Sequence, residues 1–317
     1  MPQEYYSDFR AYLGELEKRG RLHRWRRPVN KDTELMPLMR LQYRGIEDSK
    51  RRAFLYENVR DGKGKQFDIR VATGVYGSSR DITALGLGCD DPRDIYEKWR
   101  DALAHMHEPR LVSSAPVQEE VYSGARLKEF PVTQLPSPVE EPGFSCGIRV
   151  TAPFSTKDPD TGIRNVGMYS GHFRGDHKLI AGIARTHHAL LYHHPSAVRR
   201  KEPLPVAIVL GSLPDITYVS AANLPYGIDE IAVAGGIRRR PVEMVPCKTI
   251  PLEVPADAEI VIEGEISIDA MERSEPFSDY PGYLMAERAL RPVIDVKAIT
   301  HRRDAIFTAI LVGLPPS

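Results

Sequence analysis

The chain has 317 residues, 42% hydrophobic and 27% charged, an ordinary composition for a globular protein long enough for two domains. Its 43 basic and 43 acidic residues cancel, which argues against nucleic acid or an anionic membrane surface as a partner. Three widely spaced cysteines predict free thiols and exclude a zinc ribbon or a disulfide framework. No apolar run is long enough to span a membrane, and the charged start predicts no signal peptide, so we expect a cytoplasmic protein.

The first part of the chain alternates helix and strand patterns. Ser7 or Asp8 can cap a helix whose apolar residues recur at helical spacing until Gly20 ends it. Strands are predicted at 21–25 and 52–59, and further helices at 32–41, 80–88 and 91–106. We therefore predict an α/β N-terminal domain over residues 1–115.

The second part is rich in β-type runs. After an extended connection from Pro116 to Pro142, strands are predicted at 147–154, 165–173, 178–184, 204–211, 258–266, 291–299 and 305–313, with one helix at 228–237. Many short strands separated by turn clusters favour a barrel-like β domain, here residues 116–317. The chain stops directly after its last strand, a pattern that we interpret as a cut before another domain.

Two groups of residues are candidates for chemistry. Asn165, the histidine pairs at 187–188 and 193–194, and Glu230 combine amide, imidazole and carboxylate groups, a set that suits Mn²⁺ or Mg²⁺. Taken one by one, these residues are better explained as surface histidines or a helix-capping carboxylate, because no H-E-x-x-H or zinc spacing is present. In "SEPFSDYPGYL", Ser274, Glu275 and Asp279 form either a solvated corner or part of an acid–base site.

Six motifs resemble, in order, those of the UbiD-like decarboxylases, a family that includes 3-octaprenyl-4-hydroxybenzoate and ferulic acid decarboxylases. They are "NVGMY", "GIARTHH", "PLPVAIVLGSLPD", "GIDEIAVAGGIRRRPVEMVPC", "LEVPADAEIVIEGEIS" and "SEPFSDYPGY". The resemblance implies a split β-barrel of the flavin-reductase type that binds prenylated FMN, with Mn²⁺ and in many members K⁺ at the cofactor phosphate. It also implies a small carboxylic acid as substrate, a flavin prenyltransferase as supplier of the cofactor, and a homo-oligomer.

The resemblance assigns roles to particular residues. The metal ligands implied are Asn165, His188 and Glu230. The residues implied to line the cofactor are Asn165, Met168, Tyr169, Ser170, His187, His188 and Glu230. Asp279 falls where the family keeps its proton-donating carboxylate, with Glu275 close by as a second catalytic candidate.

Two positions depart from the family pattern. Ser170 stands where the family has an arginine that bridges two carboxylates, and Ser274 stands where it has the first glutamate of the acid loop. A serine cannot make the bidentate contacts of a guanidinium. His172, Arg174 and Arg185 are the nearby residues that we consider as replacements, and Glu275 is displaced by one position.

The leading hypothesis is a reversible (de)carboxylase of an aromatic, heteroaromatic or α,β-unsaturated acid, with Asp279 as the proton donor. The alternative is a divergent, non-catalytic flavin-binding subunit or a truncated member, because the family's C-terminal domain is absent from this chain. A simple metal hydrolase that uses the histidine pairs is the third reading. It predicts tight zinc binding without a flavin.

Overall fold

The computed structural model describes residues 4–144, 147–278, 284–285 and 289–312. The helices are α1 (Phe9–Lys18), α2 (Leu35–Gly45), α3 (Arg80–Gly86), α4 (Ile95–Ala104), α5 (His194–Arg200), α6 (Pro214–Ala221) and α7 (Glu230–Arg238). The strands of the first region and its attachments are β1 (Leu22–Trp25), β2 (Val29–Asn30), β3 (Ala53–Tyr56), β4 (Val59–Arg60), β5 (Gln66–Phe67), β6 (Arg70–Thr73), β7 (Arg110–Leu111) and β8 (Glu120–Ser123). The later strands are β9 (Arg149–Lys157), β10 (Arg164–Phe173), β11 (Lys178–Gly182), β12 (Leu204–Leu210), β13 (Glu243–Pro246), β14 (Glu253–Pro255), β15 (Ile260–Arg273), β16 (Phe277–Ser278), β17 (Leu284–Met285), β18 (Leu290–His301) and β19 (Ile306–Ala309).

Helix α1 shows how local sequence sets the N-terminal region. The Asp8 side chain accepts a hydrogen bond of 2.8 Å from the Ala11 amide and so caps the helix. Gly20 follows the last turn with a φ of +67°, a conformation that glycine adopts without strain. The apolar face of α1 is buried in a cluster with α3 and the sheet β1-β3-β6-β19.

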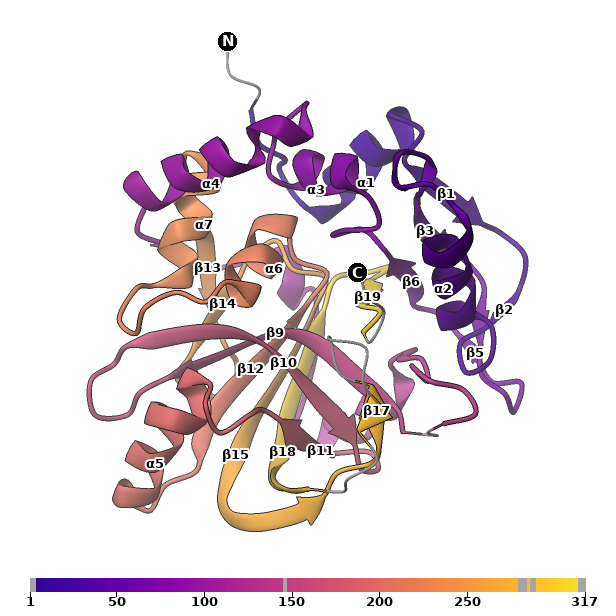
Figure 1. The fold of residues 1–317 in the computed structure, drawn as a ribbon. Coiled ribbons are helices and arrows are strands. Elements are labelled where there is room, and N and C mark those ends of the chain that lie inside the picture. The colour runs from indigo at the N-terminus through magenta and orange to yellow at the C-terminus, as the bar shows by residue number, and fades with distance from the viewer. Residues whose placement is uncertain (1–3, 145–146, 279–283, 286–288, 313–317) are drawn as a thin grey trace.

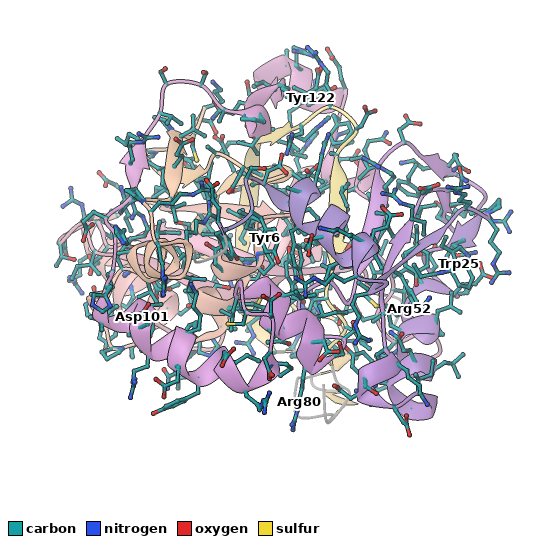
Figure 2. All side chains as sticks on the ribbon, turned by 90° about the horizontal axis from the view of Figure 1, so that it is seen from above. Tyr6, Trp25, Arg52, Arg80, Asp101 and Tyr122 are labelled. Atoms are coloured by element: carbon teal, nitrogen blue, oxygen red, sulfur yellow. The ribbon has the colours of Figure 1, made fainter. Side chains whose placement is uncertain are left out.

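Helices α1, α3 and α4 lie above the barrel in Figure 1, with β1, β3 and β6 to its right. Seen from above, Tyr6 lies near the middle, between Asp101 on α4 and Trp25 on β1 (Figure 2). Helix α7 packs closely against α4 because Gly236 has no side chain. A Cβ atom there would lie 2.3 Å from the backbone oxygen of Ala102.

The second region is a closed six-stranded antiparallel barrel. Its order is β11-β10-β9-β12-β15-β18, and β18 pairs back with β11 to close it. Strand β8 extends the sheet from β18. Inward-facing residues such as Phe154, Tyr169, Ile208 and Ile262 fill the interior. A smaller sheet, β14-β13-β7, flanks the barrel.

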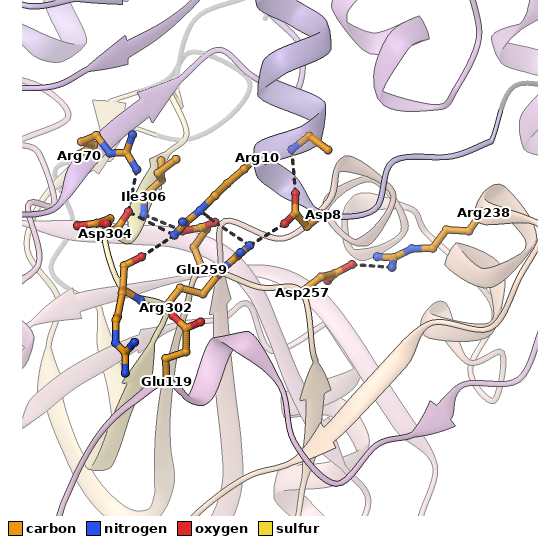
Figure 3. Close-up of polar contacts among 12 residues, drawn as sticks. Asp8, Arg10, Arg70, Glu119, Arg238, Asp257, Glu259, Arg302, Asp304 and Ile306 are labelled. Carbon is orange, nitrogen blue, oxygen red and sulfur yellow. Dashed lines mark hydrogen bonds and ion pairs between the residues drawn. The ribbon is translucent and has the colours of Figure 1, made fainter.

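The buried Glu259 carboxylate ties the two regions together. Arg10 of α1 donates two hydrogen bonds to it, of 2.8 and 2.9 Å, and the Ile306 amide donates a third of 3.0 Å. Arg302 bridges Glu259 and Asp8, the capping residue of α1 (Figure 3). The start of the chain and the last described strand therefore meet at one charge cluster.

The predicted architecture, an α/β region followed by a β-barrel, is confirmed. Strand β19 differs from the expectation of a barrel strand, since it pairs in parallel with β6 of the N-terminal sheet. Helices α5 and α6 were not expected from the sequence, because with seven and eight residues they are too short to show a clear helical period. The division at residue 115 stays a prediction. Within the described residues, no helix is long and apolar enough to cross a membrane.

Candidate functional site

A cavity of about 900 Å³ opens where β10 meets the α6–α7 region. Every residue predicted to hold the metal or the cofactor lines it, from Asn165 to Ser170 on β10, His187 and His188 after β11, and Glu230 at the start of α7. The fold thus brings together residues that are far apart in the sequence. Their roles in binding remain predictions.

Asn165 and Glu230 form the polar centre of one wall. The Asn165 side-chain amide donates a hydrogen bond of 2.9 Å to one Glu230 oxygen, and the Val166 backbone amide donates one of 3.0 Å to the other. The Tyr169 hydroxyl donates to the Asn165 side-chain oxygen at 2.9 Å. Gly167 permits this arrangement, because a Cβ atom there would lie within 2.1 Å of the Tyr169 ring.

The Glu230 carboxylate is only 4% exposed. Burial raises its pKa to about 7, since the charged form loses its hydration, while its hydrogen bonds to Val166 and Asn165 oppose the shift. Its place in the first turn of α7, which Asp229 caps through a bond of 2.9 Å to the Ile231 amide, partly offsets the cost of a negative charge.

The histidines fall into different environments. The ring of His187 stacks on Tyr169, with centroids 5.2 Å apart, and His188 packs edge-on against Tyr226 at 5.4 Å. Burial lowers the pKa of His188, which favours the neutral form that can bind a metal. His193 is instead a fully buried residue whose Nδ1 lies 2.8 Å from the Thr156 hydroxyl.

Of the two predicted catalytic residues, the structure describes only Glu275. Asp279 lies outside the described residues. Glu275 does not line the cavity, and its carboxylate accepts a hydrogen bond of 3.0 Å from Arg174 in a separate pocket of about 580 Å³.

The structure adds a residue that the sequence did not suggest. Arg149 on β9 lines the cavity beside Ser170 and forms a buried ion pair with Glu140. His172 also lines the cavity, whereas Arg174 does not and instead pairs with Glu272 and Glu275. The only signal in the sequence was an arginine among the apolar residues of a predicted strand, "GIRVTAPF".

The residues of the cavity fit the metal that the resemblance implies. The Glu230 carboxylate and the Asn165 amide oxygen, which accepts a hydrogen bond from the Tyr169 hydroxyl, are hard oxygen ligands of the kind that Mn²⁺ and Mg²⁺ prefer. Across the described part of the chain, no group of three or more His, Cys, Asp or Glu side chains is arranged to hold a metal. The predicted set has only two residues of those types, with Asn165 as the third member.

Comparisons with known proteins place these observations in a family. The model of the 3-octaprenyl-4-hydroxybenzoate carboxy-lyase Rift-related domain matches residues 110–315, and that of the carboxy-lyase N-terminal domain matches residues 13–103. An uncharacterised protein of Aquifex aeolicus (strain VF5) is 33% identical over 98% of this chain, and one of Archaeoglobus fulgidus is 30% identical over 98%. The chain spans 65% of the length of each of these curated relatives.

Two solved structures are similar over nearly the whole chain. An evolved dimeric form of the UbiD-class enzyme HmfF from Pelotomaculum thermopropionicum, in complex with prFMN, has 31% identity and a TM-score of 0.86, covering 97% of this chain and 68% of that one. The vanillic acid decarboxylase of Sedimentibacter hydroxybenzoicus in its closed form has 25% identity and a TM-score of 0.89, covering 99% and 66%.

Proposed function

The chain belongs to the UbiD family of carboxy-lyases, and from this premise we propose that it is a reversible (de)carboxylase of an aromatic, heteroaromatic or α,β-unsaturated acid that uses prenylated FMN and Mn²⁺. The observation that carries the proposal is the buried Asn165–Glu230 pair on the wall of a cavity large enough for a flavin and a small acid. The prFMN bound by the similar enzyme HmfF supports the choice of cofactor.

The proposal assigns a role to each group of residues that lines the cavity. Asn165, His188 and Glu230 would hold Mn²⁺, whose positive charge would offset the repulsion between the Glu230 carboxylate and a bound phosphate. Tyr169 fixes the orientation of the Asn165 side chain through its hydroxyl. Met168, Ser170 and His187 line the cofactor.

Removal of CO₂ from an sp² carbon leaves electrons that no side chain can stabilise, and the prenylated flavin supplies the electron sink when it is bound. In this proposal Asp279 delivers a proton to the carbon that loses CO₂. Glu275, held by Arg174, sits four residues earlier in the same segment and lines a separate pocket, so it takes no direct part in this step. The protein works in the cytoplasm as a homo-oligomer, and a flavin prenyltransferase supplies its cofactor.

A second candidate function is a non-catalytic flavin-binding subunit. Two observations favour it, the short side chain of Ser170 on the cavity wall and the buried Ser274 in the place of the family's glutamate. In this case the protein would hold flavin and metal but would not turn over any acid.

The test is to produce the chain together with a flavin prenyltransferase and Mn²⁺, and to identify the released flavin by absorbance and mass. We expect prenylated FMN at close to one per chain, followed by CO₂ release from members of a panel of aryl and acrylic acids. Asp279→Asn should keep the flavin and lose CO₂ release, whereas Glu275→Gln should keep both. Bound flavin without turnover would select the non-catalytic subunit, and a folded protein with no flavin would refute both candidates.

A further inference from the structure

Two buried polar atoms at one end of the cavity have no hydrogen-bond partner among the described residues. They are Nδ1 of His172 and the hydroxyl of Ser274, and each residue is only 2% exposed. Both residues line the cavity. A buried polar group without a partner costs roughly 1–3 kcal/mol, so two in the lining of one cavity point to a ligand that satisfies them.

The same end of the cavity carries positive charge. Among the described residues that line the cavity, the cationic ones are Arg149 and Arg291, whereas the anionic one is Glu230 on the α7 side. Arg149 is paired in register with His172 across β9 and β10, and Ser170 is paired with Thr151. Arg149 and Ser170 are thus diagonal neighbours on one face of the sheet, about 7 Å apart.

Two neighbouring side chains hold Arg149 in place. Its guanidinium forms a buried ion pair with Glu140 and lies 4.9 Å from the centroid of the Phe277 ring. Phe277 also packs edge-on against His172, at 5.6 Å. These contacts hold the guanidinium and the His172 ring against the same Phe277 side chain before any ligand arrives.

The charges around His172 also favour an anion at this position. Burial lowers the pKa of His172 to about 3, and the nearby charges of Arg149, Arg174 and Arg291 add to the shift. His172 is therefore neutral at physiological pH, and its surroundings favour an anion.

We propose that Arg149, His172 and Ser274 form a subsite that binds the carboxylate of the acid substrate, with Glu140 as the counter-charge that positions Arg149. The guanidinium pairs with the carboxylate, and His172 Nδ1 and the Ser274 hydroxyl donate hydrogen bonds to it. This subsite rests on the proposed function only in naming the anion as the substrate's acid group. It supplies from β9 the positive charge that Ser170 does not supply from β10.

The test is isothermal titration of the full chain with benzoate and with benzamide, its neutral isostere. Each titration is made without flavin and after saturation with FMN, whose binding is measured separately. We expect benzoate to bind at least tenfold more tightly than benzamide. Arg149→Gln and Glu140→Gln are combined in one variant, because removing one member alone would leave a buried unpaired charge.

The combined variant should lose at least tenfold of its benzoate affinity and keep its FMN affinity. His172→Phe, which keeps a ring of similar size, should also weaken benzoate binding. The matched control replaces the exposed pair Arg110 and Glu243 by glutamines and should bind both probes as the unchanged chain does. Equal binding of benzoate and benzamide, no benzoate binding by the unchanged chain, or full benzoate affinity in the combined variant would overturn the subsite. Loss of FMN binding with benzoate selectivity intact would refute the proposed function instead.

Discussion

The side-chain amide of Asn165 donates a hydrogen bond of 2.9 Å to the carboxylate of Glu230, and it joins the barrel strand β10 to the first turn of α7. The two residues belong to segments that are 65 positions apart. Burial raises the pKa of the Glu230 carboxyl, so its charged form needs a counter-charge. A cation bound beside this pair would stabilise the charged carboxylate.

Glu230→Gln should therefore weaken Mn²⁺ retention at least tenfold. Glutamine keeps the size of the side chain and removes the anionic oxygen ligand. The measurement is the manganese content of purified protein after dialysis, by elemental analysis. Glu253→Gln is the matched control, because Glu253 pairs with Lys157 and Arg164 and does not line the cavity. Equal manganese retention by Glu230→Gln and the unchanged chain would remove Glu230 from the metal site.

Gly167→Ala should disturb the same wall by displacing the Tyr169 side chain. A Cβ atom at this position would lie 2.1 Å from the Tyr169 ring, so the ring must move away from Asn165. We expect FMN affinity to fall about tenfold, a loss close to that of one hydrogen bond to a polar partner. Fluorescence titration with FMN measures it.

Gly14→Ala is the control for this substitution, because a Cβ atom at Gly14 would meet nothing within 4 Å. In the middle of α1 the change to alanine should raise stability by roughly 0.5–1 kcal/mol and leave FMN binding unchanged. If Gly167→Ala binds FMN as tightly as Gly14→Ala does, Tyr169 has no part in positioning Asn165.

Much of the fold could be predicted from local sequence. The Asp8 cap and Gly20 marked the two ends of α1, and alternating apolar runs located the strands of the barrel. These signals lie within a few residues of the element that they define. The pairing of β19 with β6 could not be predicted in this way, because parallel pairing across more than 200 residues depends on the packing of the whole chain.

The cavity, too, could be predicted from the sequence only in part. Residues of the quoted motifs, such as Asn165 and Glu230, were expected together and do meet. Arg149 and Glu140 were not expected, because no motif contains them and their pairing depends on the segment before β9 folding back on itself, where Val139 bridges Ile148. Glu275 was expected near the acid, and the contact with Arg174 directs its carboxylate to another pocket. Sequence patterns thus identified the elements, and the barrel's register decided which side chains share the cavity.

The charge cluster at Glu259 should make a large contribution to stability. Glu259 is fully buried and receives hydrogen bonds from Arg10, Arg302 and the Ile306 amide. Removing one member of a buried ion pair leaves an uncompensated charge, so Glu259→Gln should lower the free energy of unfolding by about 3 kcal/mol. Urea unfolding followed by circular dichroism measures the change.

Glu47→Gln provides the comparison. Glu47 forms an ion pair of 2.8 Å with Lys50 in which both side chains are more than 70% exposed. Its loss should cost less than about 0.5 kcal/mol. Similar losses in the two variants would show that Glu259 does not tie the N-terminal region to the barrel.

His193 should make stability depend on pH in the acid range. It is fully buried, and burial lowers its pKa to about 4 from an unfolded value near 6.5. Because the unfolded chain takes up the proton at a higher pH than the folded chain does, His193 lowers stability as the pH falls from 6.5 toward 4. Between pH 7.5 and pH 5 this loss amounts to about 2 kcal/mol.

The measurement is urea unfolding of the unchanged chain and of His193→Asn at a series of pH values. Asparagine does not titrate, so the difference between the two stabilities should shrink by that amount on going to pH 5. A difference that stays constant across this range would mean that His193 is protonated within the folded protein, and that its contact with Thr156 does not require the neutral ring.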